Sequence, residues 1–287
     1  MLFCKVYKDN GVALDLNGQE PKWQFFNADG LNPPSAQINT TRIAGTYGSR
    51  FNSAFLNNRN IVLYLRINGD AERNRRELES FFPTGEKVRM RFTTERSDVF
   101  ANGYVETVDY ALFTINQVMQ ISVICPDPFL YDWDEIVVDG SDSLGGFEFP
   151  FAINIGHPVP FGTYEETRVV EIDNDSGAPT PVEIEVTFNR STFMVAVYND
   201  TLGEVIELRN GTSSVPGFNE GDVLVLNTDP LHPQATLNGT NIFNKVRQNS
   251  TFYLLAPGEN VMTYYIYGPG ANKARISYKY RKRYRGI

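Results

Sequence analysis

Residues 120–132 read QISVICPDPFLYD, and this stretch decides how the chain is organised. Its first half alternates apolar and polar residues with the period of two that is typical of a half-buried strand, and the strand ends at Cys125. Pro126 and Pro128 cannot donate to a strand ladder, so they end the strand and stiffen the exit from it. Asp127 is a residue type that caps such turns. We interpret Cys125, Pro126, Asp127 and Pro128 as a domain-junction marker and not as a chemical site.

The composition differs on the two sides of this junction, which favours two domains. Residues 1–133 carry 14 basic and 15 acidic side chains, whereas residues 134–272 carry 5 basic and 19 acidic ones. The segment after the junction is rich in Asp, Ser and Gly and is typical of a linker. A length of 287 residues also suits two domains. The sequence therefore predicts an N-terminal domain over residues 1–133 and a C-terminal domain over residues 134–287.

Alternation with a period of two dominates the whole chain and predicts a mainly β protein. The first domain is expected to be β-sandwich-like, with one helix and a β-hairpin. The second has short strand-like segments at the spacing of a β-sandwich. In the first domain the residues expected on buried faces are Ile61, Leu63, Leu65, Ile67, Phe113, Ile115, Met119, Ile121, Val123 and Cys125. In the second, the expected strands are TRVVEI, PVEIEVTF (with Val182, Ile184, Val186 and Phe188 inward), FMVAVY, EVIEL, DVLVL, FYLL, VMTYYIY and ARISYKY.

One segment, DAERNRRELESFF at residues 70–82, has the features of a helix. Asp70 is a good N-cap residue, and Glu72 lies four residues before Arg76, the spacing of a helical ion pair. Pro83 follows and ends the helix. The helix is expected to link two strands of the first domain.

Cysteine and histidine are too few and too isolated to indicate catalysis or a metal site. Cys4 and Cys125 belong to no CxxC pair and have no nearby ligand residues, so we interpret both as buried thiols. His157 and His232 each adjoin a proline and are interpreted as turn residues. The sequence contains no GxxxxGK[ST], GxSxG or GxGxxG motif in a suitable context.

The acidic segments do not form a recognisable catalytic or calcium-binding pattern either. Loops counted from Asp139 or from Asp173 lack the glycine and the final glutamate that an EF-hand requires, which leaves only an irregular calcium site as an alternative. The paired acids Glu165–Glu166 and Glu183–Glu185 could flank a glycosidic bond, but such spacing is typical of a solvated face. We therefore predict no enzyme activity and no cofactor.

The chain shows no sign of a membrane-spanning or secreted protein. No window approaches the roughly 18 apolar residues that a transmembrane helix needs. The first residues, MLFCKVYKDN, lack the pattern of a secretion signal. The sequence predicts a product that is made in the cytoplasm and has no membrane partner.

The end of the chain is basic, since residues 273–287 hold 7 basic residues and no acid. Aromatic and apolar residues alternate there with a basic set that consists of Arg275, Lys279, Arg281, Arg283 and Arg285. Such a strand could follow a phosphate backbone, but the acidic residues 134–272 would repel nucleic acid. We therefore interpret the basic set as a partner-binding strand that meets an acidic surface, on its own chain or on a neighbour's.

The order of segments resembles that of the distal tail proteins (Dit) of siphophages, over nearly the whole chain. In the first domain the resemblance rests on NADGLNPPSA, RNIVLYLRINGD, LESFFPTGE, the hairpin region ANGYVETVDY and QISVICPDPFLYD. In the second it rests on EIDNDSGAPTPVEIEV, GDVLVLNTD, LNGTNIF, NSTFYLLAPGENVMTYY and SYKYRKRYRGI. None of these segments carries a catalytic group.

The resemblance implies a structural role in a virion. Distal tail proteins form a ring, usually a hexamer, that joins the tail tube to the host-binding baseplate or tip. The N-terminal domain builds the ring, and a galectin-like or carbohydrate-module-like β-sandwich forms the C-terminal domain. The implied partners are further copies of the chain, the tail tube protein, a tail-tip or tail-associated lysin protein, and receptor-binding proteins.

One alternative to the structural role is a module that binds cell-wall glycan directly during host recognition. Sugar sites commonly stack a ring on an aromatic side chain, but Trp23 and Trp133 both precede the expected sandwich. Tyrosines could take their place, and the sequence singles out none of them. A galectin-like fold does not by itself make a lectin.

Overall fold

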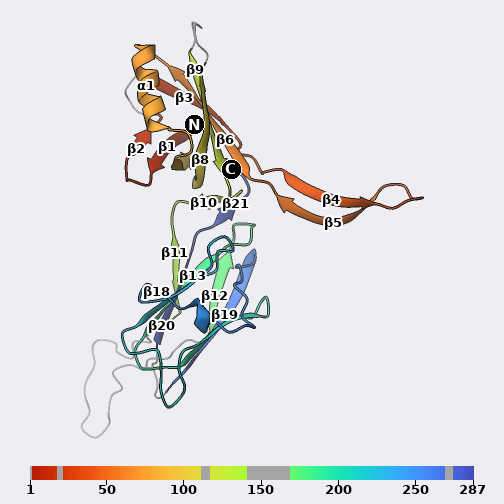
Figure 1. Cartoon of the computed structure of the whole chain (residues 1–287), viewed down its shortest axis with the longest axis vertical. Coiled ribbons are helices and arrows are strands. Elements are labelled where there is room, and N and C mark those ends of the chain that lie inside the picture. Colours follow the sequence, from red (N-terminus) through yellow and green to blue (C-terminus); the bar gives the residue numbers. More distant parts are fainter. Residues whose placement is uncertain (1, 18–21, 111–116, 141–168, 269–273) are drawn as a thin grey trace, which may run out of the picture. The chain divides into compact units, whose positions relative to one another are not determined.

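The computed structural model describes residues 2–17, 22–110, 117–140, 169–268 and 274–287. The chain divides into two compact units, one of Met1–Trp133 with Arg283–Ile287 and one of Asp134–Lys282. Arg283–Ile287, which the sequence assigned to the second domain, therefore lies in the first unit. The mainly β fold is confirmed (Figure 1).

A nine-stranded sheet forms the body of the first unit, with strand order β2-β1-β7-β8-β9-β6-β3. A short strand, β10, pairs with β8 and with the C-terminal strand β21. The strands of this sheet are β1 (Phe3–Lys8), β2 (Ala13–Asp15), β3 (Trp23–Asp29), β6 (Arg59–Ile67), β7 (Lys87–Thr93), β8 (Asp98–Tyr110), β9 (Val118–Cys125), β10 (Leu130–Asp132) and β21 (Arg283–Tyr284).

The period-two pattern correctly identified the buried face of this sheet. On β6, Ile61, Leu63 and Leu65 are completely buried, and each is flanked by more exposed residues. On β9 the buried set is Met119, Ile121, Val123 and Cys125. Phe113 and Ile115, which were expected to belong to the same set, lie outside the described residues.

The predicted helix is confirmed as α1 (Ala71–Phe81). The Asp70 carboxylate accepts a hydrogen bond from the Arg73 backbone N–H at 3.2 Å, which caps the helix. Glu72 and Arg76 form an exposed ion pair at 2.6 Å. Leu78 is completely buried in the core of the first unit, so the amphipathic pattern fixes the inward face of the helix.

A second, two-stranded sheet in the first unit consists of β4 (Ala36–Arg42) and β5 (Ser49–Leu56). These strands pair with each other and with no strand of the nine-stranded sheet. They extend away from that sheet as a long hairpin (Figure 1). We refer to residues 36–56 as the arm.

The second unit is a β-sandwich of two sheets, as predicted. Both sheets contribute to one hydrophobic core, and Val182, Ile184, Val186 and Phe188 of β13 are all buried in it. The six-stranded sheet consists, in order, of β11 (Ile136–Asp139), β20 (Ala274–Tyr280), β13 (Val182–Phe188), β16 (Val223–Asn227), β17 (Gln234–Leu237) and β18 (Thr240–Asn241). The four-stranded sheet consists of β12 (Val169–Asn174), β19 (Gly258–Tyr267), β14 (Met194–Asn199) and β15 (Glu204–Arg209).

Two of the local predictions for the second unit were wrong. The segment FYLL was expected to be a strand, but only Leu255 makes a ladder contact, a single bridge to Thr180. Tyr253 and Leu255 are buried, so the apolar side chains of this segment pack into the core without forming a strand. The acidic segment after Trp133 was interpreted as the domain boundary and not as a strand, yet Ile136–Asp139 forms β11 because it pairs with β20.

Candidate functional site

The end of β9 has the turn geometry that the sequence suggested. Cys125 is the last residue of the strand and is completely buried. Burial raises the pKa of its thiol to about 12, against the opposing effect of the Arg59 charge, so this cysteine is not a nucleophile at neutral pH. Asp127 accepts a hydrogen bond from the Phe129 backbone N–H at 3.1 Å and so caps the turn. It also accepts one from the Tyr131 hydroxyl.

Next to this turn lies a buried arginine whose partners are all backbone carbonyls. Arg59, at the start of β6, has only 2% of its surface exposed. Its Nε atom donates to the Pro128 carbonyl at 2.8 Å, and Nη1 donates to the carbonyls of Gly30 and Asn32, the latter at 2.9 Å. Nη2 donates to the Arg285 carbonyl at 2.5 Å. One guanidinium thus fastens three separate segments of the first unit together.

Burial lowers the pKa of Arg59 from its ordinary value, while the nearby Cys125 and Asp127 oppose that shift. An arginine keeps its charge in spite of such a shift, because its ordinary pKa is above 12. The five N–H donors of a guanidinium suit a site surrounded by carbonyl oxygens, which a lysine could not satisfy in the same way. This role could not be predicted from the sequence, because an arginine at the start of a strand is usually exposed.

Gly30 brings one of these carbonyls into position, and its substitution is predicted to be costly. Its φ is +86°, and a Cβ there would lie 1.9 Å from the carbonyl oxygen of Asn60. Gly30→Ala should therefore lower the free energy of unfolding by about 2 kcal/mol or more, which urea unfolding would measure. Gly11→Ala is the matched control, since Gly11 has a φ of +82° but no atom within 4 Å of its Cβ position. Equal losses in the two variants would show that the close approach at Gly30 does not matter.

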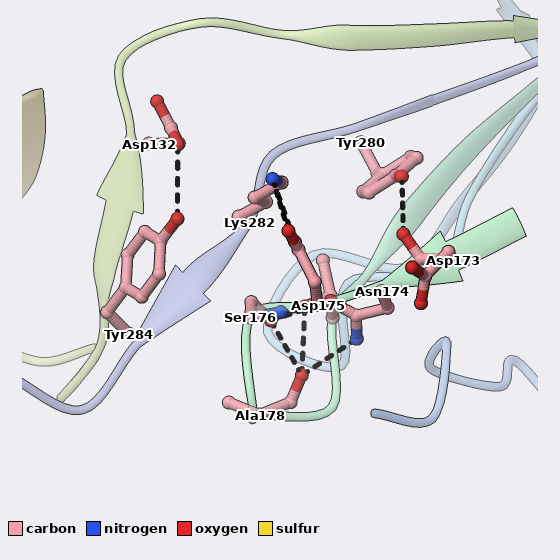
Figure 2. Close-up of polar contacts among 10 residues, drawn as sticks. Asp132, Asp173, Asn174, Asp175, Ser176, Ala178, Tyr280, Lys282 and Tyr284 are labelled. Atoms are coloured by element: carbon pink, nitrogen blue, oxygen red, sulfur yellow. Dashed lines mark hydrogen bonds and ion pairs between the residues drawn. The ribbon is translucent and has the colours of Figure 1, made fainter. Parts of the chain in front are cut away.

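The C-terminal segment Arg283–Ile287 completes the first unit. Its strand β21 pairs with β10 directly after the proline turn. Figure 2 shows the Tyr284 hydroxyl donating to the Asp132 carboxylate, at 3.2 Å. The backbone N–H of Ile287 donates to the Leu31 carbonyl at 3.2 Å. The chain therefore crosses between the units twice, after Trp133 and after Lys282. Within the first unit, the strand before the first crossing, β10, pairs with the strand after the second, β21.

The structure divides the predicted basic set between the two units. In the second unit, Lys279 forms an ion pair with Glu185 at 2.5 Å, and Arg281 forms one with Glu135 at 3.6 Å. The hydrogen bond with Glu185 raises the pKa of Lys279. In the first unit, Arg283 is buried with its guanidinium 3.9 Å from the centre of the Phe129 ring.

Only Arg275 and Arg285 of the basic set are exposed. The side chains of Lys279 and Arg281 meet acidic residues of their own chain, which was one of the two alternatives that the sequence left open. The five residues therefore form no continuous basic surface within one unit.

The acidic loop that starts at Asp173 is held by protein contacts. Lys282 approaches the Asp175 carboxylate at 2.8 Å (Figure 2). The buried Asn174 side chain donates to the Ala178 carbonyl at 2.9 Å. Across the described ranges, no three His, Cys, Asp or Glu residues lie close enough together to hold a metal ion.

The remaining candidates for chemistry are dispersed. His232 is exposed and lies 3.4 Å from the Asp229 carboxylate, in a turn. Glu183 and Glu185 both approach Lys279, so they lie on a solvated, ion-paired face. His157 and Glu165–Glu166 lie outside the described residues. None of the helices in the described part is long and apolar enough to cross a membrane.

Among the described residues of the first unit, the arm has the most exposed apolar side chains. Every one of its residues from Ala36 to Phe55 is exposed or only half-buried. The exposed fraction is 63% for Ile38, 61% for Phe51 and 50% for Phe55, and Tyr47 near the tip is fully exposed. The arm has two basic residues, Arg42 and Arg50, and no acid. Large apolar side chains gathered on one exposed element are typical of a protein–protein contact.

The arm was not predicted from the sequence. The hairpin of the first domain was expected near residues 101–110 instead. Those residues are part of β8, which does pair antiparallel with β9. The signal that could have revealed the arm is the absence of a sustained apolar face in AQINTTR and SRFNSAFL. A strand without such a face cannot pack against its own core.

Comparisons with known proteins give one domain family for part of the chain and one fold for all of it. Residues 175–284 match the family model of the C-terminal domain of siphovirus-type tail components. The structure is similar over 98% of its length to 99% of the Dit protein (gp 19.1) of phage SPP1, with a TM-score of 0.68 and 15% identity. That protein is described as a paradigm of the hub adsorption apparatus in phages that infect Gram-positive bacteria. A search of curated protein sequences gave no match.

A second phage provides similar structures. Chains of the phage P2 baseplate in its activated conformation, with Ca and with Sr, are similar at TM-scores of 0.56 and 0.55. Each is 12% identical, and the match covers 100% of both chains. At such identities the likeness establishes the fold, and the family model adds the evidence from sequence. Residues 175–284 are therefore similar to the C-terminal domain of siphovirus-type tail components, and over its whole length the chain has the fold of the SPP1 Dit protein.

Proposed function

We propose that this structural component of a phage tail tip closes into a homohexameric ring in which the arm of each subunit binds the next subunit. The observation that carries the proposal is the arm itself, residues 36–56, with its exposed Ile38, Tyr47, Phe51 and Phe55. An isolated two-stranded hairpin is only marginally stable in water. Binding to another surface would bury its apolar side chains and stabilise its strands.

A copy of the same chain is the partner that suits the arm best. In a closed ring with head-to-tail contacts, each subunit uses two different patches, one to give and one to receive. The arm supplies the first patch, and the body of the neighbouring first unit supplies the second. Residues 1–133 are nearly neutral in net charge, so copies of the first unit can pack without strong repulsion.

The ring would connect other proteins of the tail. The tail tube protein would bind on one side, and a tail-tip or tail-associated lysin protein on the other, with receptor-binding proteins attached to the assembly. The exposed Arg275 and Arg285 are available for such contacts. The protein would be made in the bacterial cytoplasm and act in the virion. This role requires no catalytic activity and no cofactor.

The mass of the purified full-length chain tests the ring directly. Light scattering coupled to size exclusion should give a species near six times the 32.4 kDa mass of one chain. Because the arm contact is mainly apolar, this mass should persist from about 0.1 to 1 M salt, over which exposed charge pairs are screened. A monomer at every concentration and salt level would contradict the proposal.

A further inference from the structure

We propose that the second unit binds an acidic glycan, on the outer face of its four-stranded sheet and in the pocket beside that face. We call this surface the tyrosine–arginine face and define it by Tyr198, Glu207, Arg209, Tyr265 and Tyr267. The inference goes beyond the ring-forming role and does not depend on it. It rests on strand register, exposure, a pocket and the distribution of charge.

Strand register brings the members of the tyrosine–arginine face together. On β14, Val195 and Val197 are buried in the core, so the alternate residues face outward. Opposite Ala196 stand Glu207 of β15 on one side and Tyr265 of β19 on the other. Opposite Met194, in the next row, stand Arg209 on one side and Tyr267 on the other. Residues far apart in the sequence therefore form two adjacent rows.

The tyrosines of this face present ring surface to solvent. Tyr265 and Tyr267 have exposed fractions of 40% and 41%. Tyr198 packs edge-on against Tyr265, with ring centres 5.5 Å apart and an interplanar angle of 89°. This contact holds Tyr265 in place. Ala196, between Tyr265 and Glu207 in the same row, is buried beneath its neighbours. A fixed, half-exposed aromatic ring is a suitable platform for the apolar face of a sugar ring.

A pocket of about 610 Å³ adjoins the arginine side of this face. Arg209 belongs to both, so the two are continuous. The pocket lies beside the short 3₁₀ helix Phe243–Lys245, and its polar lining consists of Arg209, Asn244, Lys245, Arg247, Gln248 and Asn249. Its volume is in the range of small-ligand sites. The amides offer both donors and acceptors to hydroxyl groups.

Basic residues are concentrated at this pocket in an otherwise acidic part of the chain. Residues 134–272 contain 5 basic and 19 acidic residues, and Arg209, Lys245 and Arg247 are three of the 5. Arg247 pairs with Glu207 at 3.4 Å. Within the part of the chain that the structure describes, no carboxylate pairs with Arg209 or Lys245. Two positive charges are therefore available for an anionic ligand.

The mixture of groups favours a saccharide over other anions. The Glu207 carboxylate pairs with Arg247 and can also accept hydrogen bonds from ligand hydroxyls, which suits a ligand that carries hydroxyl groups as well as negative charge. An acidic glycan supplies the hydroxyls, the apolar ring faces and the anion. The anion, a carboxylate or a phosphate, would be held by Arg209 and Lys245.

Retention of defined polymers by the immobilised full-length protein tests this inference. The probes are teichoic acid, which carries phosphate, hyaluronan, which carries carboxylate, and dextran, which is neutral. The wild-type protein should retain at least one of the two anionic polymers and not dextran. Arg209→Glu should weaken binding about tenfold or more, because a charge-assisted hydrogen bond is lost and a repulsion is added. Tyr265→Ala should weaken it several-fold at unchanged net charge.

Two matched variants separate a built site from general charge attraction. Arg190→Glu makes the same charge change at an exposed position of the same unit, and Tyr104→Ala removes an exposed tyrosine from the first unit. Both should bind as the wild type does. Equal weakening by Arg190→Glu and Arg209→Glu, no effect of Tyr265→Ala, or no retention of either anionic polymer would overturn the inference. The mass of the same samples reports separately on the ring.

Discussion

Replacement of Arg59 by methionine is expected to lower the free energy of unfolding of the first unit by about 3 kcal/mol or more. Methionine fills much of the volume but removes the guanidinium donors to the Gly30, Asn32, Pro128 and Arg285 carbonyls. A hydrogen bond from a charged group contributes roughly 1.5–3 kcal/mol, and Arg59, which is buried, makes four of them. The C-terminal segment should also detach more easily, because it loses the Arg285 contact.

Tryptophan fluorescence can follow this change in the first unit alone. The chain has two tryptophans, Trp23 and Trp133, and both lie in that unit. Trp133 stacks on Tyr7 with ring centres 5.5 Å apart, so its emission should respond to unfolding. The urea midpoint from fluorescence should fall for Arg59→Met, whereas the far-UV signal that remains from the second unit should unfold as in the wild type.

Arg66→Met is the matched control for this substitution. Arg66 lies on the same strand, β6, but is exposed, and its guanidinium lies over the Phe26 ring, 5.8 Å from the ring centre. Its loss should change the free energy of unfolding by about 0.5 kcal/mol or less. If the two variants had the same fluorescence midpoint, Arg59 would not have the fastening role that its hydrogen bonds indicate.

Replacement of both Phe51 and Phe55 by serine is expected to convert the ring into monomers. In the separate subunit these side chains are at least half exposed, so the substitution should leave the fold intact. In the ring each would be buried, and a buried phenylalanine contributes about 1.5–3 kcal/mol. The loss of two per contact would weaken each association roughly a hundredfold or more.

Light scattering and thermal unfolding together distinguish this outcome from misfolding. The variant should elute as a monomer with the same tryptophan emission as the wild type. Phe3→Ser is the control, since Phe3 is 46% exposed on β1 of the same unit and lies outside the arm. Retention of the ring by the arm variant, or its equal loss in Phe3→Ser, would show that the arm is not the contact between subunits.

The two predictions concern features that the sequence revealed to different degrees. The strand β9 and its end at Cys125 followed from alternation and from two prolines, which act locally. The role of Arg59 did not, because its partners lie 27 to 226 positions away in the chain. The arm was missed for a related reason. Whether a strand is exposed depends on whether distant segments of the chain pack against it.

The tyrosine–arginine face shows the same limit for a binding surface. Tyr265 and Glu207 are distant in sequence, and only the pairing of β19 and β15 with β14 makes them neighbours. The sequence raised tyrosines as substitutes for tryptophan in a sugar site but gave no basis for choosing among them. The chemistry of each residue was visible, and its surroundings were not.

The sequence by itself determined the mainly β class, the helix α1, the junction near Trp133 and the resemblance to distal tail proteins. These depend on periodicity, capping and residue order, which are short-range properties. Only the tertiary structure decided that Arg283–Ile287 returns to the first unit, that Lys279 and Arg281 are paired within their own chain, and that the apolar side chains of the arm are exposed. Those outcomes depend on which distant surfaces meet, because hydrogen bonds, ion pairs and burial form between segments whose separation in the sequence carries no record of their contact.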